Sequence, residues 1–205
     1  MSERRVRAYV GLGANVGDAG RTLAWAIGAL AGLPSTRLRG VSRLYATDPV
    51  GVTDQAEFRN AVVALDVPAG EDPAIGALDL LTQLKDLERQ SGRQERKRWG
   101  PRELDLDLLI FGRAEIAVER PPAAQSSDAD HDLAKATKLL VVPHPEARHR
   151  LFVLAPLSDV ARWLVPPGWH ETVTTARVRQ EAAEGHDAVR RIGDWDAARG
   201  RWTTD

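Results

Sequence analysis

Strict alternation of leucine and aspartate between Leu104 and Leu108 is the sequence feature that most constrains the fold. In a β-strand successive side chains point to opposite faces, so the leucines would share one face while Asp105 and Asp107 share the other. In a helix the two acids would diverge. The alternation therefore predicts a strand from Leu104 to Phe111 that buries its leucines and presents a pair of carboxylates.

A pair of carboxylates suits a hard cation such as Mg²⁺, although an amphipathic strand with a solvated acidic face would show the same alternation. Just upstream lie the basic residues Arg93, Arg96, Lys97, Arg98 and Arg102. A cationic loop beside an acidic strand fits a polyphosphate bound together with a metal ion. We therefore interpret this region as a candidate phosphate and metal site.

The rest of the pattern predicts an α+β fold, with one domain as the default for 205 residues. Strands are expected at 6–12, 38–46 and 60–67, with a glycine-rich turn at 11–15. Asp18 and Asp72 are expected N-caps of two helices, and Pro73 fits the first turn of the second helix. This order suits an antiparallel sheet with helices on one face.

The second half of the chain is less regular in pattern. Residues 113–138 are rich in Ala, Pro, Ser, Asp and Glu and are interpreted as a surface insertion. Further strands are expected at 139–142 and 151–154, followed by a short helix near 158–164. Beyond Pro166 no role is assigned, and residues 166–205 are treated as an extension packed on the same domain.

Composition excludes several classes of protein. A formal net charge of -1 argues against a long nucleic acid as the main partner. The chain has no cysteine, which excludes disulfides and thiolate chemistry. No stretch of apolar residues is long enough to cross a membrane, and no signal peptide or P-loop is present, so a cytoplasmic protein is expected. The spacing of Gly11, Gly13 and Gly17 does not fit a dinucleotide fingerprint.

Several motifs together resemble one family. Arg98-Trp99-Gly100-Pro101-Arg102 followed by Leu104-Asp105-Leu106-Asp107 is similar to the signature of the 6-hydroxymethyl-7,8-dihydropterin pyrophosphokinases of folate synthesis. The resemblance extends, in family order, to the segments 9–18, 45–49, 58–61 and 142–145. It covers residues 6 to about 165.

The resemblance implies a ferredoxin-like βαββαβ fold with long catalytic loops, and an enzyme that transfers diphosphate from ATP to the pterin alcohol. Asp105 and Asp107 match the ligands of two Mg²⁺ ions. By the same match, the residues that contact or enclose ATP are Glu88, Arg93, Arg98, Trp99, Arg102, Leu108, His144 and Arg150. Among these, Arg93, Arg98, Trp99 and Arg102 join the two aspartates as catalytic residues.

For the pterin, the resemblance implies a ring held between two aromatics, Phe58 and Phe152, with Asn60 bonding to its edge. Stacking and an amide that donates and accepts suit a flat heterocycle. Thr47, Asp48 and Val50 match the loop that contacts the substrate. A monomer with ATP and the pterin as its only partners is expected.

The sequence departs from the family pattern at three places: Ala14 replaces a usual serine, Glu95 a common loop arginine, and 113–138 is longer than usual. Two other readings stay open. A non-enzymatic ferredoxin-like module could bind RNA through an aromatic sheet face, and a related ATP-dependent transferase could act on another heterocyclic alcohol.

Overall fold

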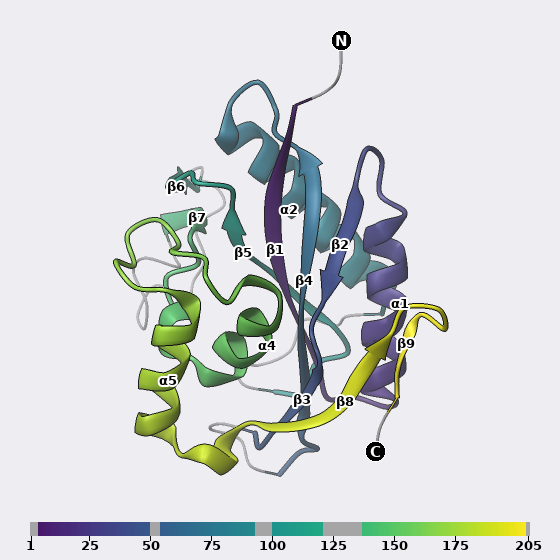
Figure 1. Ribbon diagram of the computed structural model, residues 1–205. Helices are drawn as coiled ribbons and strands as arrows, with labels where there is room; N and C mark the ends of the chain where they lie inside the picture. The colour runs from purple at the N-terminus through teal and green to yellow at the C-terminus, as the bar shows by residue number, and fades with distance from the viewer. Residues whose placement is uncertain (1–3, 50–53, 93–99, 121–136, 204–205) are drawn as a thin grey trace.

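The computed structural model describes residues 4–49, 54–92, 100–120 and 137–203, and its main feature is one antiparallel sheet (Figure 1). The strands of this sheet are β1 (Arg5–Ala14), β2 (Arg37–Val41), β3 (Leu44–Thr47), β4 (Phe58–Pro68), β5 (Asp105–Phe111), β8 (Arg190–Asp196) and β9 (Arg201–Thr203). They lie in the order β5-β1-β4-β3-β8-β9, and β2 also pairs with β4. The expected α+β class with an antiparallel sheet is confirmed.

Helices cover both faces of the sheet, so the expectation of helices on one face is wrong. α1 (Ala19–Ala31) and α2 (Pro73–Gln90) pack on one face. α4 (Leu151–Ala161) packs on the other face, and α5 (Val173–Glu184) lies against α4 (Figure 1). The reason lies in β4, where successive residues from Asn60 to Leu65 are all buried, which requires cover on both sides.

The two predicted helix caps are confirmed. The Asp18 carboxylate accepts a hydrogen bond from the Arg21 amide at 3.0 Å, at the start of α1. The Asp72 carboxylate accepts from the Ala74 amide at 2.7 Å, and Pro73 begins α2. Each cap satisfies an amide that the first helical turn leaves without an intrahelical acceptor.

The glycine-rich segment at 11–15 is mostly strand and not the expected turn. β1 continues to Ala14, and Gly11 and Gly13 pair with β4 on one side and with β5 on the other. Ladder bonding from both sides holds these glycines extended, despite the low strand preference of glycine. The chain turns after Ala14, before α1.

The single strand expected at 38–46 is divided into β2 and β3. Between them, the Ser42 hydroxyl accepts from the Val62 amide at 2.9 Å and donates to the Arg43 carbonyl at 2.7 Å. A short polar side chain thus replaces part of the regular ladder, as serine often does at strand breaks.

The expected strand at 151–154 is wrong, because α4 begins at Leu151. The buried residues Leu154, Leu157 and Ala161 recur at helical spacing and pack in one hydrophobic cluster with Val62 and Ala64 of β4. The helix then ends at Ala161, earlier than the expected end near 164.

Part of the predicted surface insertion is ordered as a strand. β6 (Ile116–Glu119) pairs with β7 (Lys138–Val142), and Ile116 is buried. The strand expected at 139–142 is therefore confirmed. Residues 121–136 lie outside the described part of the chain.

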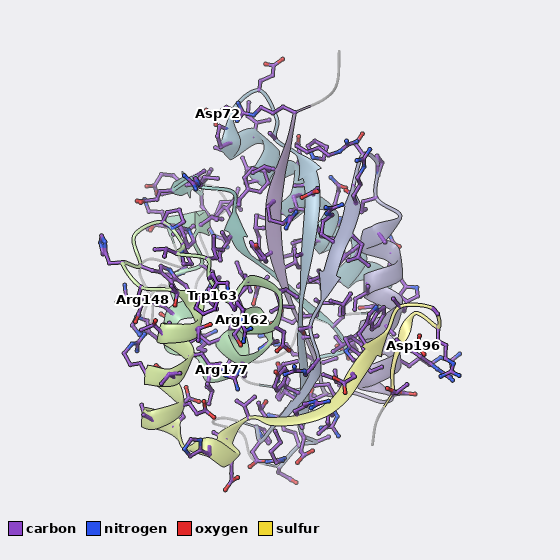
Figure 2. All side chains as sticks on the ribbon, viewed as in Figure 1. Asp72, Arg148, Arg162, Trp163, Arg177 and Asp196 are labelled. Atoms are coloured by element: carbon purple, nitrogen blue, oxygen red, sulfur yellow. The ribbon has the colours of Figure 1, made fainter. Side chains whose placement is uncertain are left out.

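The C-terminal segment extends the sheet. β8 pairs with β3, and β9 returns along β8. Trp202 is buried, and its indole donates to the Ser42 carbonyl at 3.0 Å. Arg177 lies on α5 (Figure 2), and its guanidinium donates to the Ser158 hydroxyl of α4 at 3.1 Å. Of the helices in the described ranges, none has the length and apolarity that crossing a bilayer demands.

Candidate active site

The acidic pair lies on β5, as the alternation predicted. Leu106 and Leu108 are buried in the core beneath α1 and α2. Asp105 and Asp107 therefore face the opposite side of the sheet. The Asp105 carboxylate is 29% exposed and accepts from the Arg102 guanidinium at 3.0 Å. Two carboxylates and a guanidinium thus meet at one point of the sheet.

The electrostatics at Asp107 favour a bound cation. Burial, and then the neighbouring charge of Asp105, raise the pKa of Asp107 to about 6. Lys85 and Arg150 oppose this rise in the pKa and Glu88 adds to it, so all three lie within electrostatic reach of Asp107. A divalent cation between the two carboxylates would remove their mutual repulsion, and hard oxygen donors suit Mg²⁺.

The protein supplies only part of such a coordination sphere. No cluster of three or more acidic or histidine ligands occurs among the described residues. Mg²⁺ commonly takes one or two carboxylates from a protein and the remaining oxygens from water or from a phosphate group of the substrate. The acidic pair therefore fits a metal that arrives with a polyphosphate.

A glycine separates the acidic pair from the predicted pterin side. Gly13 of β1 pairs with Asn60 on β4 and with Asp105 on β5, so the three residues form one row across the sheet. A Cβ at Gly13 would lie 3.6 Å from the Asn60 side-chain oxygen and 4.0 Å from the Asp105 Cβ. The surface between the amide and the carboxylate is therefore clear of side chains from β1.

The structure brings three of the six predicted pterin residues, Thr47, Phe58 and Asn60, together on this same face. The Asn60 amide donates to the Thr47 hydroxyl at 2.9 Å, and both side chains are buried. Phe58 pairs with Thr47 across β3 and β4, two residues along from Asn60. Phe152 lies in the first turn of α4, which packs on β4, and the Arg150 guanidinium lies 5.8 Å from the centre of the Phe152 ring.

Two predicted ATP residues flank β5 at the edge of the sheet. The buried Glu88 carboxylate accepts from the Leu106 amide at 2.7 Å, and the His144 amide donates to the Leu109 carbonyl at 2.8 Å. Glu88 also accepts from Lys85 at 2.8 Å. Leu108 points its side chain into the core under α1 and α2, so only its backbone is available at this edge.

The remaining predicted residues are more scattered. Asp48 is 75% exposed at the end of β3 and forms an ion pair with Arg190 at 3.4 Å. Arg150 also forms an ion pair with Glu146 at 3.5 Å. The predictions for Val50, Arg93, Arg98 and Trp99 lie outside the described residues.

Asn15 braces the candidate site, although the sequence pattern did not single it out. Its buried side-chain amide donates to Gln55 and to the Ala56 carbonyl, both at 3.0 Å, and its oxygen accepts from the Arg102 amide at 2.7 Å. The side chain thus ties the residues before β4 to those before β5. A buried asparagine directly after a glycine-rich strand is a signal for such a role, because buried amides require partners.

The chain is similar to known proteins of one family over most of its length. Residues 9–162 match the family model for 7,8-dihydro-6-hydroxymethylpterin-pyrophosphokinase (HPPK). A 2-amino-4-hydroxy-6-hydroxymethyldihydropteridine pyrophosphokinase from Pseudomonas aeruginosa is 39% identical over 165 residues, covering 80% of this chain and 86% of the relative. The protein of the same name from Bacillus subtilis is 34% identical over 174 residues, covering 85% of this chain and 86% of the relative.

Solved structures show the same fold. Wild-type Plasmodium falciparum HPPK-DHPS aligns with 99% of this chain at a TM-score of 0.68 and 13% sequence identity. This chain spans about half of that protein, 50% of its length. The structural likeness supports the fold, while the sequence matches extend over most of the chain and of its bacterial relatives. On these grounds, the chain belongs to the 7,8-dihydro-6-hydroxymethylpterin-pyrophosphokinase family.

Proposed function

We propose that this chain transfers diphosphate from ATP to 6-hydroxymethyl-7,8-dihydropterin, giving the pterin diphosphate and AMP in folate biosynthesis. The observation that carries this proposal is the row Asn60, Gly13, Asp105. It supports a pterin bound beside Asn60 and a metal-bound triphosphate beside Asp105, with nothing from β1 between them. Family membership and the pyrophosphokinase relatives support the same reaction.

On the nucleotide side, Asp105 and Asp107 would hold two Mg²⁺ ions. When bound, the metal neutralises polyphosphate charge and aligns the transferred group. Arg102 lies against Asp105, and the charge of Arg150 acts on Asp107, which supports both guanidinium groups as phosphate contacts. The further ATP contacts proposed from the family match are Glu88, Arg93, Arg98, Trp99, Leu108 and His144.

On the pterin side, Asn60 bonds to the edge of the ring, and its bond to Thr47 fixes the orientation of its amide. Phe58 and Phe152 stack on the two faces of the ring, each contributing about 0.5 to 1.5 kcal/mol beyond burial. Asp48 and Val50 complete the loop that contacts the substrate. An amide supported by a buried hydroxyl discriminates well between ring edges, since an unpaired partner would be costly.

In the reaction, the hydroxymethyl oxygen attacks the β-phosphorus of ATP. The bond between that phosphorus and the oxygen bridging to the α-phosphorus breaks, AMP leaves with the bridging oxygen, and the hydroxyl proton is released. The residues of the chain hold the two substrates in line and stabilise charge on the transferred group.

The proposal also covers the topology of the fold, the oligomeric state and the location of the protein. The order of β1, α1, β2 with β3, β4, α2 and β5 supports a ferredoxin-like βαββαβ core within residues 1–165, with 166–205 as an extension. A monomer is proposed, because the strands and the helix that carry the described residues of the site pair and pack within one chain. A cytoplasmic location fits the use of ATP. The readings as an RNA-binding module or as a transferase for another alcohol are not favoured by the family match.

The test is to incubate the protein with Mg²⁺, ATP and the reduced pterin and to identify the nucleotide product. Pterin-dependent AMP is expected, and pterin-dependent ADP would contradict the proposal. Asp107→Ala should lower the rate by about 100-fold or more, because a charged group at the transferring phosphates is lost. Asp79→Ala, which removes an exposed acid on α2, is the matched control and should keep full activity.

A further inference from the structure

The C-terminal strand β8 touches the residues that frame the proposed pterin site. β8 pairs with β3 and lies beyond residue 162, where the family match ends. From this arrangement we propose that Arg190 of β8 is a positioning residue, which holds both ends of the β3–β4 connection and thereby orders the pterin side of the site. The inference rests on the proposed function, because it assigns Arg190 a task in that reaction.

Arg190 links two residues that are adjacent to the site but separate in sequence. Its guanidinium donates to the Asp48 carboxylate at 3.4 Å and forms an ion pair with Glu57. Asp48 directly follows Thr47, and Glu57 directly precedes Phe58. One side chain therefore ties down the residue after β3 and the residue before β4.

Glu57 is held by arginines from β4 and β8, the two strands that lie on either side of β3. Arg59 of β4 forms an ion pair with one oxygen of the Glu57 carboxylate at 2.8 Å, and Arg190 contacts the other oxygen. Arg59 and Arg190 both pair with Ala46, one from β4 and one from β8, so the two arginines flank β3. The hydrogen bond from Arg59 and the charge of Arg190 lower the pKa of Glu57, which keeps it ionised between them.

Arg190 lies on the opposite face of the sheet from the proposed pterin site, so it does not contact the substrate. Arg59, Ala46 and Arg190 are paired across three adjacent strands. This row is shifted by one residue along the strands from the row that contains Tyr45 and Asn60. Because side chains alternate along strands, Arg190 lies on the face opposite the Asn60 amide. This separation makes it a positioning residue.

The sheet order predicts which substrate is affected. β8 is next to β3, whereas β5 with the acidic pair lies at the other end, beyond β4 and β1. Loss of Arg190 should therefore loosen the pterin side and leave the ATP side unchanged. A general loss of stability would affect both.

The experiment compares Arg190→Gln with the control Arg199→Gln. The control removes another C-terminal ion pair, which joins Arg199 to Asp196 at the turn between β8 and β9. For Arg190→Gln we expect the KM for the pterin to rise roughly 3- to 5-fold, the range that exposed ion pairs reach, with an unchanged KM for ATP. Arg190→Lys should restore part of the loss. Equal KM values for Arg190→Gln and Arg199→Gln, or an equal rise for both substrates, would overturn the inference.

Hydrogen exchange separates this inference from the proposed function. Amides in residues 44–48 and 54–60 should exchange faster in Arg190→Gln than in Arg199→Gln, whether or not the protein is active. Unchanged exchange would overturn the positioning role. A wild-type protein that released no AMP with the pterin would instead refute the proposed function, and with it the task assigned to Arg190.

Discussion

Asn15 and Arg102 are joined by a reciprocal pair of hydrogen bonds. The Arg102 backbone amide donates to the Asn15 side-chain oxygen at 2.7 Å, and the Asn15 backbone amide donates to the Arg102 carbonyl at 2.9 Å. The same Asn15 side chain donates to the Ala56 carbonyl near the start of β4. One buried residue thus couples the segment before Phe58 to the segment before Asp105, which are the proposed pterin and metal sides.

Replacing Asn15 by alanine should harm both sides at once. The variant loses three side-chain hydrogen bonds, and two of them leave backbone groups of Ala56 and Arg102 without that partner. We expect the free energy of unfolding to fall by about 2 to 3 kcal/mol, and kcat/KM to fall for ATP and for the pterin alike. Urea unfolding and steady-state kinetics measure the two effects.

Gln55→Ala is the control for Asn15→Ala, since it removes only one of the three partners of Asn15. Its cost should be about 1 kcal/mol or less. If Asn15→Ala were no worse than Gln55→Ala, the two bonds to the backbone would contribute nothing to stability.

Gly13→Ala should fold normally and still impair catalysis. The new methyl group would meet its neighbours at ordinary van der Waals distances, 3.6 Å from the Asn60 oxygen and 4.0 Å from the Asp105 Cβ. The free energy of unfolding should change by no more than about 0.5 kcal/mol. Because the methyl group occupies the surface between amide and carboxylate, kcat/KM should drop roughly 10-fold or more, as small displacements of reacting groups are costly.

Gly28→Ala provides the contrast for Gly13→Ala. A Cβ at Gly28, within α1, would meet no atom within 4 Å. Alanine in a helix is better than glycine by up to about 1 kcal/mol, so this variant should be more stable and equally active. A fully active Gly13→Ala would show that the gap is not used by the substrates.

The acidic pair could be predicted because its signal is local. Five residues from Leu104 to Leu108 carry the whole alternation, and strand geometry converts it directly into two faces. The caps at Asp18 and Asp72 were predictable for the same reason, since each bonds to an amide two or three residues away. The prediction of helix or strand fails where the local pattern is ambiguous. At Leu151, for example, a short apolar run fits a strand or a helix equally well.

The contacts of the C-terminal segment could not be predicted, because they depend on register between distant strands. Arg190 meets Asp48 across 142 residues of sequence, and Trp202 meets Ser42 across 160. A shift of one residue in β8 would move Arg190 to the other face of the sheet. Nothing in the local pattern around Arg190 or Trp202 determines that register.

Tyr45 should titrate at unusually high pH. Burial, followed by the charge of Asp159, raises the pKa of Tyr45 from 10.0 to about 12, and its hydroxyl donates to Asp159 at 2.9 Å. The folded state therefore resists ionisation while the unfolded state ionises near pH 10. The stabilisation is complete below pH 10 and is lost as the pH rises toward 12.

The absorbance of the tyrosinate ion, measured across the alkaline pH range, tests this prediction for Tyr45. The difference between the titration curves of the wild type and Tyr45→Phe isolates this one group, and its midpoint should lie at about 12. In Tyr45→Phe, the free energy of unfolding should fall less steeply between pH 10 and 12 than in the wild type. A midpoint at the ordinary tyrosine value would contradict the buried environment next to Asp159.

Trp202 should anchor the C-terminal segment to the rest of the fold. It is 8% exposed, lies edge-on to Trp195 at 4.8 Å between ring centres, and donates to the Ser42 carbonyl at 3.0 Å. Trp202→Ala should cost about 3 to 5 kcal/mol in urea unfolding, since it empties a buried aromatic site. Trp163→Ala, at a tryptophan that is 74% exposed, should change stability by less than about 0.5 kcal/mol.

Trp202→Phe separates the two parts of this anchor. The ring stays buried but the indole donor is lost, so the Ser42 carbonyl loses this donor at the break between β2 and β3. The expected cost is about 1 to 3 kcal/mol, which lies between those of the two alanine variants. Equal unfolding midpoints for Trp202→Ala and Trp163→Ala would mean that the buried Trp202 side chain adds no stability. The pairing of β8 with β3 and the packing of Ile192 and Trp195 would then hold Arg190 in position without help from Trp202.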